Sequence, residues 1–272
     1  MTITGNISKM RSINETPVQY FLPVGDEEVA MTPLIGKKIK LQHTGTINCI
    51  NCDRKTKKSF SQGYCYPCSQ RLAACDICIV RPEKCHFDEG TCREPEWGQS
   101  FCMQPHYVYL SNASGLKVGI TRESQIPTRW IDQGAIQGLP ILKAKSRFQV
   151  GLLEVEIKKH MSDKTNWQRM LKGQPETQDL KQIRDELFEE IQPEIESIDK
   201  RFGGDQISLV SDDETGVSYP VQQYPEKVKS FNFDKTPEVE GVLQGIKGQY
   251  LILDGGVINM RKFTGYEVTL TV

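Results

Sequence analysis

The sequence predicts an α+β protein in which a Cys-rich zinc-binding segment precedes a mixed α/β centre, with small β structure at both ends. Three observations support this fold class. All nine cysteines of the 272-residue chain fall between positions 49 and 102. Strand-like runs separated by Gly, Pro and charged residues occupy both ends. The middle of the chain contains a strand hairpin and segments with helical spacing of apolar residues.

The composition is typical of a globular protein without a membrane-spanning segment. Hydrophobic residues make up 38% of the chain, which is sufficient for an ordinary core in two modest domains. The chain has no run of about 18 apolar residues, and its start, MTITGNISKM, lacks the order of a signal peptide. We therefore expect a cytoplasmic protein with no membrane partner. Because the formal net charge is −1, any polyanion site must come from local clustering of Lys and Arg.

The two ends of the chain are expected to form strands together. Residues 1–48 contain the runs VQYFLPV and KKIKLQH, and residues 227–272 contain EGVLQGIKGQYLIL, GVINMRKF and YEVTLTV around an Asp-Gly-Gly turn. Each end has too few strands to be stable alone. This suggests that the two ends share one sheet or barrel.

The first four cysteines have the spacing of a zinc site. Cys49 and Cys52 form one C-x2-C pair, and Cys65 and Cys68 form another. Two tight turns can then offer four thiolates to one tetrahedral ion. In a reducing compartment, clustered pairs of this kind indicate metal rather than disulfides, and a closed four-Cys site leaves no open position for catalysis. We predict a structural zinc ion here.

A second group of candidate ligands follows at once. It contains more thiol and imidazole side chains than one tetrahedral ion can use. We expect a second structural zinc ion, bound by Cys75, Cys78, Cys85 and Cys92. Other side chains of the group are substitutes for these ligands or neighbours of them: His86, Cys102 and His106.

The segment from 106 to about 171 carries the residues best suited to chemistry. YVYLSNASGLKVGIT predicts a hairpin, and a helix is expected at 128–133, followed by a strand near 141–148. GLLEVEIKKHMS has helical spacing and carries Glu154. After it we expect an amphipathic helix, DLKQIRDELFEEIQPEIESIDKRF, that is broken by its proline.

The order of these parts resembles the GIY-YIG nuclease domain, in which a hairpin carries two short motifs and two helices carry an arginine and a metal-binding glutamate. Tyr109 lies in the place of the first motif, in the pair VY. Lys117 and Gly119 lie in the place of the second, in the run KVG. Arg129 matches the arginine of that family, and the run LEVEIK matches the pattern that holds the acid, here Glu154.

The resemblance implies a divalent-metal-dependent phosphodiesterase that acts on DNA or RNA. Glu154 would hold Mg²⁺ or Mn²⁺, largely through waters, and Arg129 would stabilise charge that grows on the phosphoryl oxygens. Tyr109 would position or deprotonate the attacking water. Gly119 would let the backbone approach the phosphate.

Two positions depart from the pattern of that family. Lys117 stands where the second motif has a tyrosine, and Gln133 stands where a histidine is common. A buried lysine with a lowered pKa could act as a base, whereas an exposed one would only hold phosphate. A non-catalytic DNA- or RNA-binding module and a zinc-braced scaffold for protein partners are therefore the alternative functions.

Further nucleic-acid contacts are expected outside these motifs. Lys55, Lys57 and Lys58 form a basic run in the first zinc loop that could contact phosphate. A solvated charged turn without a binding role is an equally good interpretation of this run. Arg122 follows the second motif directly. Trp167 could stack on a base, although a tryptophan that closes the core is the more usual arrangement.

Across the whole chain, the runs GYCYPC, GTCREPEWG, GLKVGITR and IPTRWIDQGA resemble the uncharacterised prokaryotic family called domain of unknown function 2797. That resemblance extends from end to end and implies no particular activity. We expect an N-terminal β segment, a zinc-binding segment, a GIY-YIG-like domain with an added helix, a loop and a C-terminal β segment, which are residues 1–48, 49–105, 106–202, 203–226 and 227–272.

Overall fold

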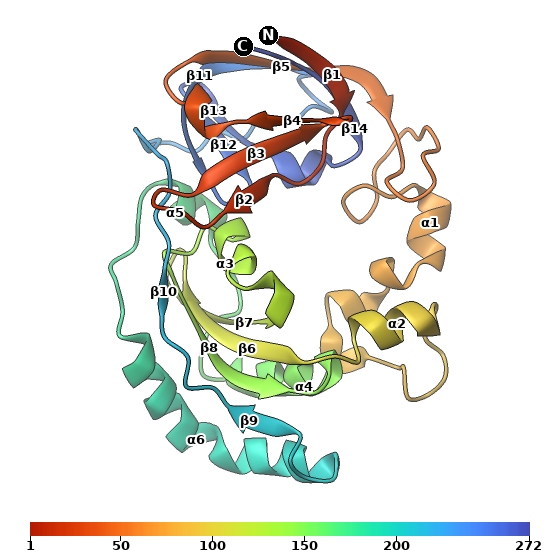
Figure 1. Cartoon of the computed structure of the whole chain (residues 1–272), viewed down its shortest axis with the longest axis vertical. Coiled ribbons are helices and arrows are strands. Elements are labelled where there is room, and N and C mark those ends of the chain that lie inside the picture. The colour runs from red at the N-terminus through yellow and green to blue at the C-terminus, as the bar shows by residue number, and fades with distance from the viewer.

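Strands from the two ends of the chain lie in one antiparallel sheet. The computed structural model describes all of residues 1–272. Met1 and Val272 are joined by a hydrogen bond from the terminal amine to the carbonyl oxygen (3.0 Å), so the two termini lie together (Figure 1). The strands, in the order in which they pair, are β1 (Thr2–Asn6), β14 (Tyr266–Thr271), β5 (Lys38–Ile47), β11 (Glu238–Lys247), β12 (Tyr250–Leu253) and β13 (Gly256–Asn259).

A second, three-stranded sheet packs against this one. Its strands are β2 (Arg11–Ile13), β3 (Gln19–Val24) and β4 (Glu27–Ala30), all antiparallel. Every second residue of β3 is buried, as expected for a strand with one face on a core. A cluster of 28 buried hydrophobic residues lies between the two sheets, and Ile131 and Ile136 of the central segment belong to it, so this core joins these two sheets, the terminal β unit, to the centre of the chain.

The centre of the chain forms a separate sheet around the predicted hairpin. Strands β6 (His106–Asn112) and β7 (Leu116–Arg122) are the hairpin, and β8 (Gln137–Ala144) pairs with the other side of β6. β6 lies in the interior of the sheet and all of its residues are buried, whereas β7 is the edge strand. The residues of β7 between its two ends are nevertheless buried as well.

Helices cover one face of the central sheet, and the terminal β unit meets the other. Val108 packs in a cluster with apolar residues of α4 (Arg147–Ile157) and α6 (Leu180–Arg201). Tyr109, the next residue, packs instead with residues of α3 (Thr128–Asp132), α5 (Trp167–Leu171) and β12. The two faces of β6 thus belong to two different cores.

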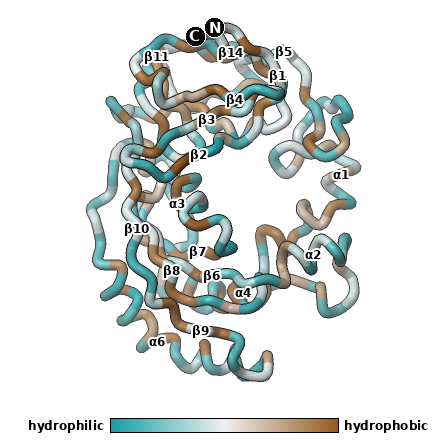
Figure 2. Tube along the Cα trace, viewed as in Figure 1, coloured by the Kyte–Doolittle hydropathy of each residue, from teal (hydrophilic) through white to brown (hydrophobic).

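Helix α6 continues through Pro193, which the sequence predicts to be a break. Proline cannot donate a hydrogen bond to the carbonyl group of Glu189. Ile191 and Ile195, on either side of it, are both buried in the core beneath the helix, and this packing offsets the lost bond. Figure 2 shows mainly hydrophilic stretches along α6 with hydrophobic ones between them, as expected for an outer helix.

The segment 203–226, which the sequence predicts to be a loop, contains two short strands. β9 (Ile207–Leu209) and β10 (Thr215–Gly216) both pair with β8. They extend the central sheet beside β8 before the chain enters the terminal β unit. No helix in the structure is long and apolar enough to cross a membrane.

The Cys-rich segment forms an arm that runs from the terminal β unit to the central sheet (Figure 1). Its regular structure is limited to α1 (Tyr66–Arg71), α2 (Pro95–Phe101) and the 3-10 turns Ala73–Cys75, Ile77–Ile79 and Pro82–Lys84. Such short elements cannot bury a large core, so the arm needs another source of stability.

Candidate functional site

The first four cysteines converge on one point, as their spacing predicts. The sulfur atoms of Cys49, Cys52, Cys65 and Cys68 all lie within 4.8 Å of one another. The distance between the sulfurs of Cys52 and Cys65 is 3.8 Å. Tetrahedral thiolates at a Zn–S distance of about 2.3 Å would have sulfurs about 3.8 Å apart. The cluster is therefore compatible with a structural zinc ion.

The backbone around this cluster explains why the two pairs meet. The amide of Ile50, inside the first pair, donates to the carbonyl oxygen of Gly63 at 2.9 Å, just before the second pair. The side-chain amide of Asn51 donates to the sulfur of Cys68 at 3.4 Å. Bonds of this kind orient thiolate ligands around a metal ion. The three lysines of the adjoining loop are exposed to solvent: Lys55, Lys57 and Lys58.

The remaining cysteines divide between two environments. Cys75 packs against the first group. The others line a single small cavity beside α2, together with His86: Cys78, Cys85, Cys92 and Cys102. His106 is fully buried, and its Nδ1 lies 2.7 Å from the carbonyl oxygen of Gln104. It does not line this cavity.

Tyr109 and Gly119 face each other across the hairpin. They are directly opposed in the β6–β7 register, and a β-carbon at Gly119 would lie only 2.5 Å from the hydroxyl oxygen of Tyr109. The hydroxyl donates to Oε1 of Gln133 at 3.0 Å. The tyrosine is fully buried, and its ring packs edge-on against Trp130. Gly119 thus leaves room for the tyrosine ring, a role that the motif alone did not suggest.

Replacing Gly119 with alanine is expected to lower the free energy of unfolding by about 1–3 kcal/mol, because the methyl group overlaps a ring that Trp130 holds in place. Chemical denaturation of the two proteins would measure this difference. Gly216→Ala is the matched control, since a β-carbon there meets no atom within 4 Å. Equal stabilities of the two variants would contradict the close contact.

Lys117, on strand β7 of the same hairpin, lies close enough to Arg129 and Glu154 for their charges to change its pKa. It is only 5% exposed. Burial, and after it the positive charge of Arg129, lower the pKa of the Lys117 amine to about 8. The charges of Glu154 and Asp163 oppose this shift. Arg129 and Glu154 also act on the pKa of Tyr109, which burial raises. The charges of Arg129 and Glu154 thus act on both Tyr109 and Lys117.

Glu154 is the carboxylate of this neighbourhood, on the second turn of α4. Burial raises the pKa of Glu154, and the positive charge of Lys158 opposes the shift. The Lys158 amine lies 3.2 Å from Glu154 and 3.1 Å from Asp163. Lys158 can therefore pair with Asp163 alone, which would leave the Glu154 carboxylate free to bind another group.

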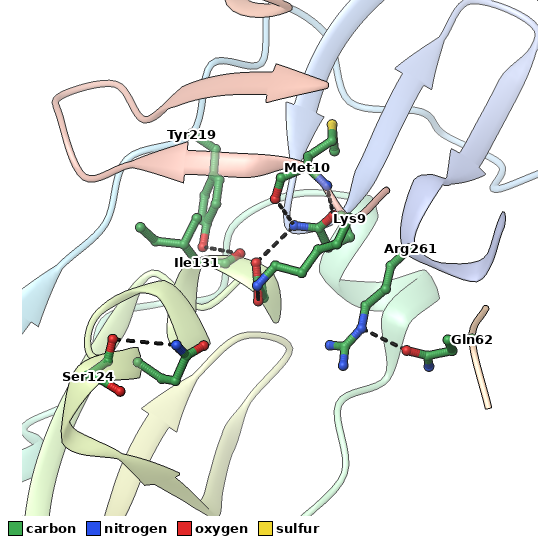
Figure 3. Close-up of polar contacts among 10 residues, drawn as sticks. Lys9, Met10, Gln62, Ser124, Ile131, Tyr219 and Arg261 are labelled. Carbon is green, nitrogen blue, oxygen red and sulfur yellow. Dashed lines mark hydrogen bonds and ion pairs between the residues drawn. The ribbon is translucent and has the colours of Figure 1, made fainter. Parts of the chain in front are cut away.

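Two arginines that sequence reasoning did not single out add to the positive charge. Burial lowers the pKa of Arg147 on α4 and of Arg261 in the terminal β unit, and the charge of Arg129 lowers both further. Arg261 donates from Nε to Oε1 of Gln62 at 2.8 Å, which links the β unit to the first cysteine loops (Figure 3). No motif marks these residues, because only the tertiary fold brings them to Arg129.

Asp132, whose negative charge acts on Arg261, already has other partners. Asp132 forms an ion pair with Lys9, and Nε2 of Gln249 donates to its other oxygen at 2.8 Å (Figure 3). The Nε atoms of Arg129 and Arg147 are buried without a hydrogen-bond partner. We define the cationic cluster as Lys117, Arg129, Arg147 and Arg261, because the charge of Arg129 acts on each of the other three.

Arg122 and Trp167, the other predicted contacts, each pack against an aromatic ring. The guanidinium carbon of Arg122 lies 3.9 Å from the centre of the Phe101 ring on α2. Trp167 is partly buried and stacks parallel to Tyr250, with ring centres 5.8 Å apart. This packing corresponds to the core-closing arrangement of Trp167.

A family model described as Protein of unknown function (DUF2797) matches residues 36–268. The match begins just before β5 and ends in β14, so it includes both cysteine groups and the cationic cluster. No curated protein and no solved structure matches the chain.

Proposed function

The chain belongs to the family described as Protein of unknown function (DUF2797), and we propose that it binds DNA or RNA at the cationic cluster and hydrolyses phosphodiester bonds there with a divalent metal ion. The observation that carries this proposal is the accumulation of positive charge around Arg129, on one buried side chain, Lys117, and on the half-buried Arg147 and Arg261. Like charges in a poorly solvated site repel one another, which costs folding free energy. Phosphate groups of a bound strand would relieve this repulsion.

The order of elements supports the hydrolytic part of the proposal. Hairpin β6–β7, helix α3, strand β8 and helix α4 follow one another as the resemblance to the GIY-YIG nuclease domain requires. Tyr109, Arg129 and Glu154 come from three of these elements and lie in one neighbourhood. Arg129 is suited to stabilise charge on phosphoryl oxygens, because one N–H group of its guanidinium has no partner within the protein.

Glu154 would hold the divalent ion. Mg²⁺ is commonly bound through one or two carboxylates and retains several waters, so a single carboxylate is an adequate protein ligand. Lys158 would then pair with Asp163, which is already 3.1 Å away. The bound ion would supply Lewis-acid stabilisation of the phosphoryl group.

Lys117 would serve as the proton acceptor in place of the tyrosine expected at its position. A lysine with a pKa of about 8 is partly neutral near physiological pH, and only the neutral amine can accept a proton from water. Tyr109 is fully buried and donates its hydroxyl proton to Gln133. Its role would be to position Gln133 and Arg129 rather than to take up a proton itself.

One observation favours binding without hydrolysis as the second candidate function. The hydroxyl group of Tyr109 is committed to Gln133, and the neighbouring motif carries a lysine. A module that has lost its tyrosine base would retain the cations that contact phosphate and would not cleave the strand. A scaffold for protein partners would need neither activity.

We also infer that the Cys-rich arm holds two structural zinc ions. The first would occupy the site of Cys49, Cys52, Cys65 and Cys68. The second would lie in the later cysteine group. Both would keep the arm folded between the two sheets, and the exposed lysines of the first loop would make additional contacts with phosphate.

The deciding experiment measures binding and cleavage of labelled single- and double-stranded DNA and RNA by the zinc-loaded protein at low salt, with Mg²⁺ or Mn²⁺. Glu154→Ala is expected to abolish cleavage and to retain binding. Arg129→Ala is expected to weaken binding about tenfold and to reduce the slope of log affinity against log salt by about one. Lys181→Ala is the control and should change neither. Lys181 is an exposed residue of α6 that pairs with Asp213.

The outcomes separate the candidate functions. Binding without cleavage in either metal would favour the non-catalytic module. Failure of the zinc-loaded protein to bind any of the four nucleic acids would refute both functions and leave the protein scaffold.

A further inference from the structure

We propose that Cys78, Cys85, Cys92 and Cys102 bind the second zinc ion, and that this ion fixes the position of helix α4. The inference rests on the proposal that the arm holds two zinc ions and is independent of nucleic-acid binding. It differs from the ligand set that sequence spacing favours, because Cys102 replaces Cys75.

The four thiols surround one cavity, although no three of their sulfurs lie within 4.8 Å of one another as those of the first group do. The four cysteines line one cavity together with Phe87 and Trp97. Cys75 does not line it and packs against Cys49, Cys65 and Cys68 instead. The C-x2-C pair formed by Cys75 and Cys78 is therefore divided between two environments. Its second member alone is available to the later group.

Helix α2 approaches the cavity so closely that only a small residue fits. A β-carbon at Gly98 would lie 3.1 Å from the sulfur of Cys92 and 3.0 Å from the ring of Phe87. The sulfur thus lies directly against the helix backbone. A metal ion held by four thiolates has no open position for a substrate, which is the arrangement of a structural metal site.

The other potential ligands nearby have different partners. Asp76, Cys78 and His86 have ligand atoms within 4.8 Å of one another. However, Nε of Arg93 lies 2.6 Å from the Asp76 carboxylate, and this positive charge would lie beside any ion that Asp76 bound. Nδ1 of His86 lies 2.7 Å from the Thr91 hydroxyl, and its Nε2 lies 3.6 Å from Asp76. We assign these groups to a polar network around the thiolates.

The proposed zinc site contacts the start of α4 through the backbone. The amide of Arg147 donates to the carbonyl oxygen of Cys102 at 2.8 Å, and its Nη2 donates to the carbonyl oxygen of Ile79 at 2.6 Å. Cys102 is a proposed ligand, and Ile79 follows another. The positions of both carbonyl oxygens therefore depend on how the metal ion holds the thiolates of Cys102 and Cys78. Arg147 is one of the four residues of the cationic cluster.

A second contact lies one turn further along α4. A β-carbon at Gly151 would lie 2.7–2.9 Å from atoms of Pro82 and Glu83, so the helix backbone touches the turn between Cys78 and Cys85. Glu154 follows three residues later on the same helix. Loss of the second zinc would release this turn and, with it, the helix that positions Glu154.

Zinc content of the purified holo-protein, measured by elemental mass spectrometry, tests the ligand set. We expect two zinc ions per chain in the wild type and in Cys75→Ser and His86→Ala, and one in Cys102→Ser. Two ions in Cys102→Ser, or one in Cys75→Ser or His86→Ala, would overturn the assignment. One ion in the wild type would overturn the second site itself.

Alkylation of the wild-type holo-protein gives the same test without a substitution that could impair folding. Cys75, Cys85 and Cys92 are all partly buried, so they are matched in exposure. We expect Cys75 to react with N-ethylmaleimide before a chelator is added, and Cys85 and Cys92 to react only afterwards. Similar rates for the three thiols under both conditions would refute the site.

Hydrogen exchange tests the link to α4. Amides of residues 147–157 are expected to exchange at least tenfold faster in Cys102→Ser than in the wild type, and at the wild-type rate in Cys75→Ser. Unchanged exchange in a Cys102→Ser protein that has lost one zinc ion would refute the coupling to α4 while leaving the ligand set intact.

Discussion

Replacing Cys65 with serine is expected to remove one zinc ion and to unfold the first part of the Cys-rich arm. A structural zinc ion contributes apparent binding free energies of about 10–16 kcal/mol in small zinc-binding peptides. Apart from Leu72, the buried cluster of this part of the arm consists of the ligand residues themselves. Without the ion, no apolar core remains to hold the two loops. We expect the free energy of unfolding of the chain to fall by on the order of 5 kcal/mol.

Zinc content and urea denaturation of Cys65→Ser would measure these effects. Cys75→Ser is the matched control, because Cys75 packs against the same cluster and is not one of its four convergent thiols. We expect the control to retain its zinc and to lose less than about 1 kcal/mol of stability. If Cys65→Ser kept both its zinc and its stability, the first site would not be a zinc site.

The loss is expected to extend to the cationic cluster. The amide of Asn48 donates to the carbonyl oxygen of Gly265 at 2.8 Å, where the first loop meets the terminal β unit. Arg261 is held by Gln62 of the same loop (Figure 3). When the loop unfolds, Arg261 loses this partner and is free to turn into solvent. Nucleic-acid binding should therefore weaken in Cys65→Ser even though no residue of the cluster has changed.

Local sequence signals were sufficient for parts of this structure. The mixed α/β class and the first cysteine group are present as predicted. Both depend on short-range patterns: alternation along strands, and two C-x2-C pairs that can close around one ion. The resemblance to a family of unknown function is shown by the match over residues 36–268.

Other features depend on distant parts of the chain and have no local signal. Arg147 and Arg261 reach Arg129 only because α4 and the terminal β unit pack around the hairpin. Spacing could not assign Cys75 and Cys102, since both are close enough in sequence to join either set. Pro193 was expected to break a helix, but the burial of residues on both sides overrides that local preference.

Replacing Lys117 with methionine is expected to stabilise the protein by about 2–3 kcal/mol at pH 7. The folded-state pKa of Lys117 is about 8, and an unfolded lysine has a pKa of about 10.4. Below pH 8 the folded protein must keep a proton on a buried amine, at a cost in free energy that the unfolded chain does not bear. Methionine has a similar length and carries no charge, so it removes this cost.

The sign of the pH dependence follows from proton counts. Between pH 8 and 10.4 the unfolded chain binds more protons at this position than the folded protein does, so the contribution of Lys117 to stability rises with pH. The advantage of Lys117→Met should therefore be full below pH 8 and should disappear towards pH 10.5. Urea denaturation at several pH values would measure it, with Lys181→Met as the exposed control. A constant difference between the two proteins over this range would contradict the lowered pKa.

The lowered pKa of Lys117 also predicts how the rate of cleavage depends on pH. If the neutral amine of Lys117 is the proton acceptor, cleavage should increase with pH and level off above pH 8, because the fraction of neutral amine does the same. Lys117→Met should then be inactive although it is more stable and still carries Arg129 for binding. Stability and activity would change in opposite directions on one substitution, which a purely structural lysine would not produce. Cleavage by Lys117→Met at the wild-type rate would exclude Lys117 as the base.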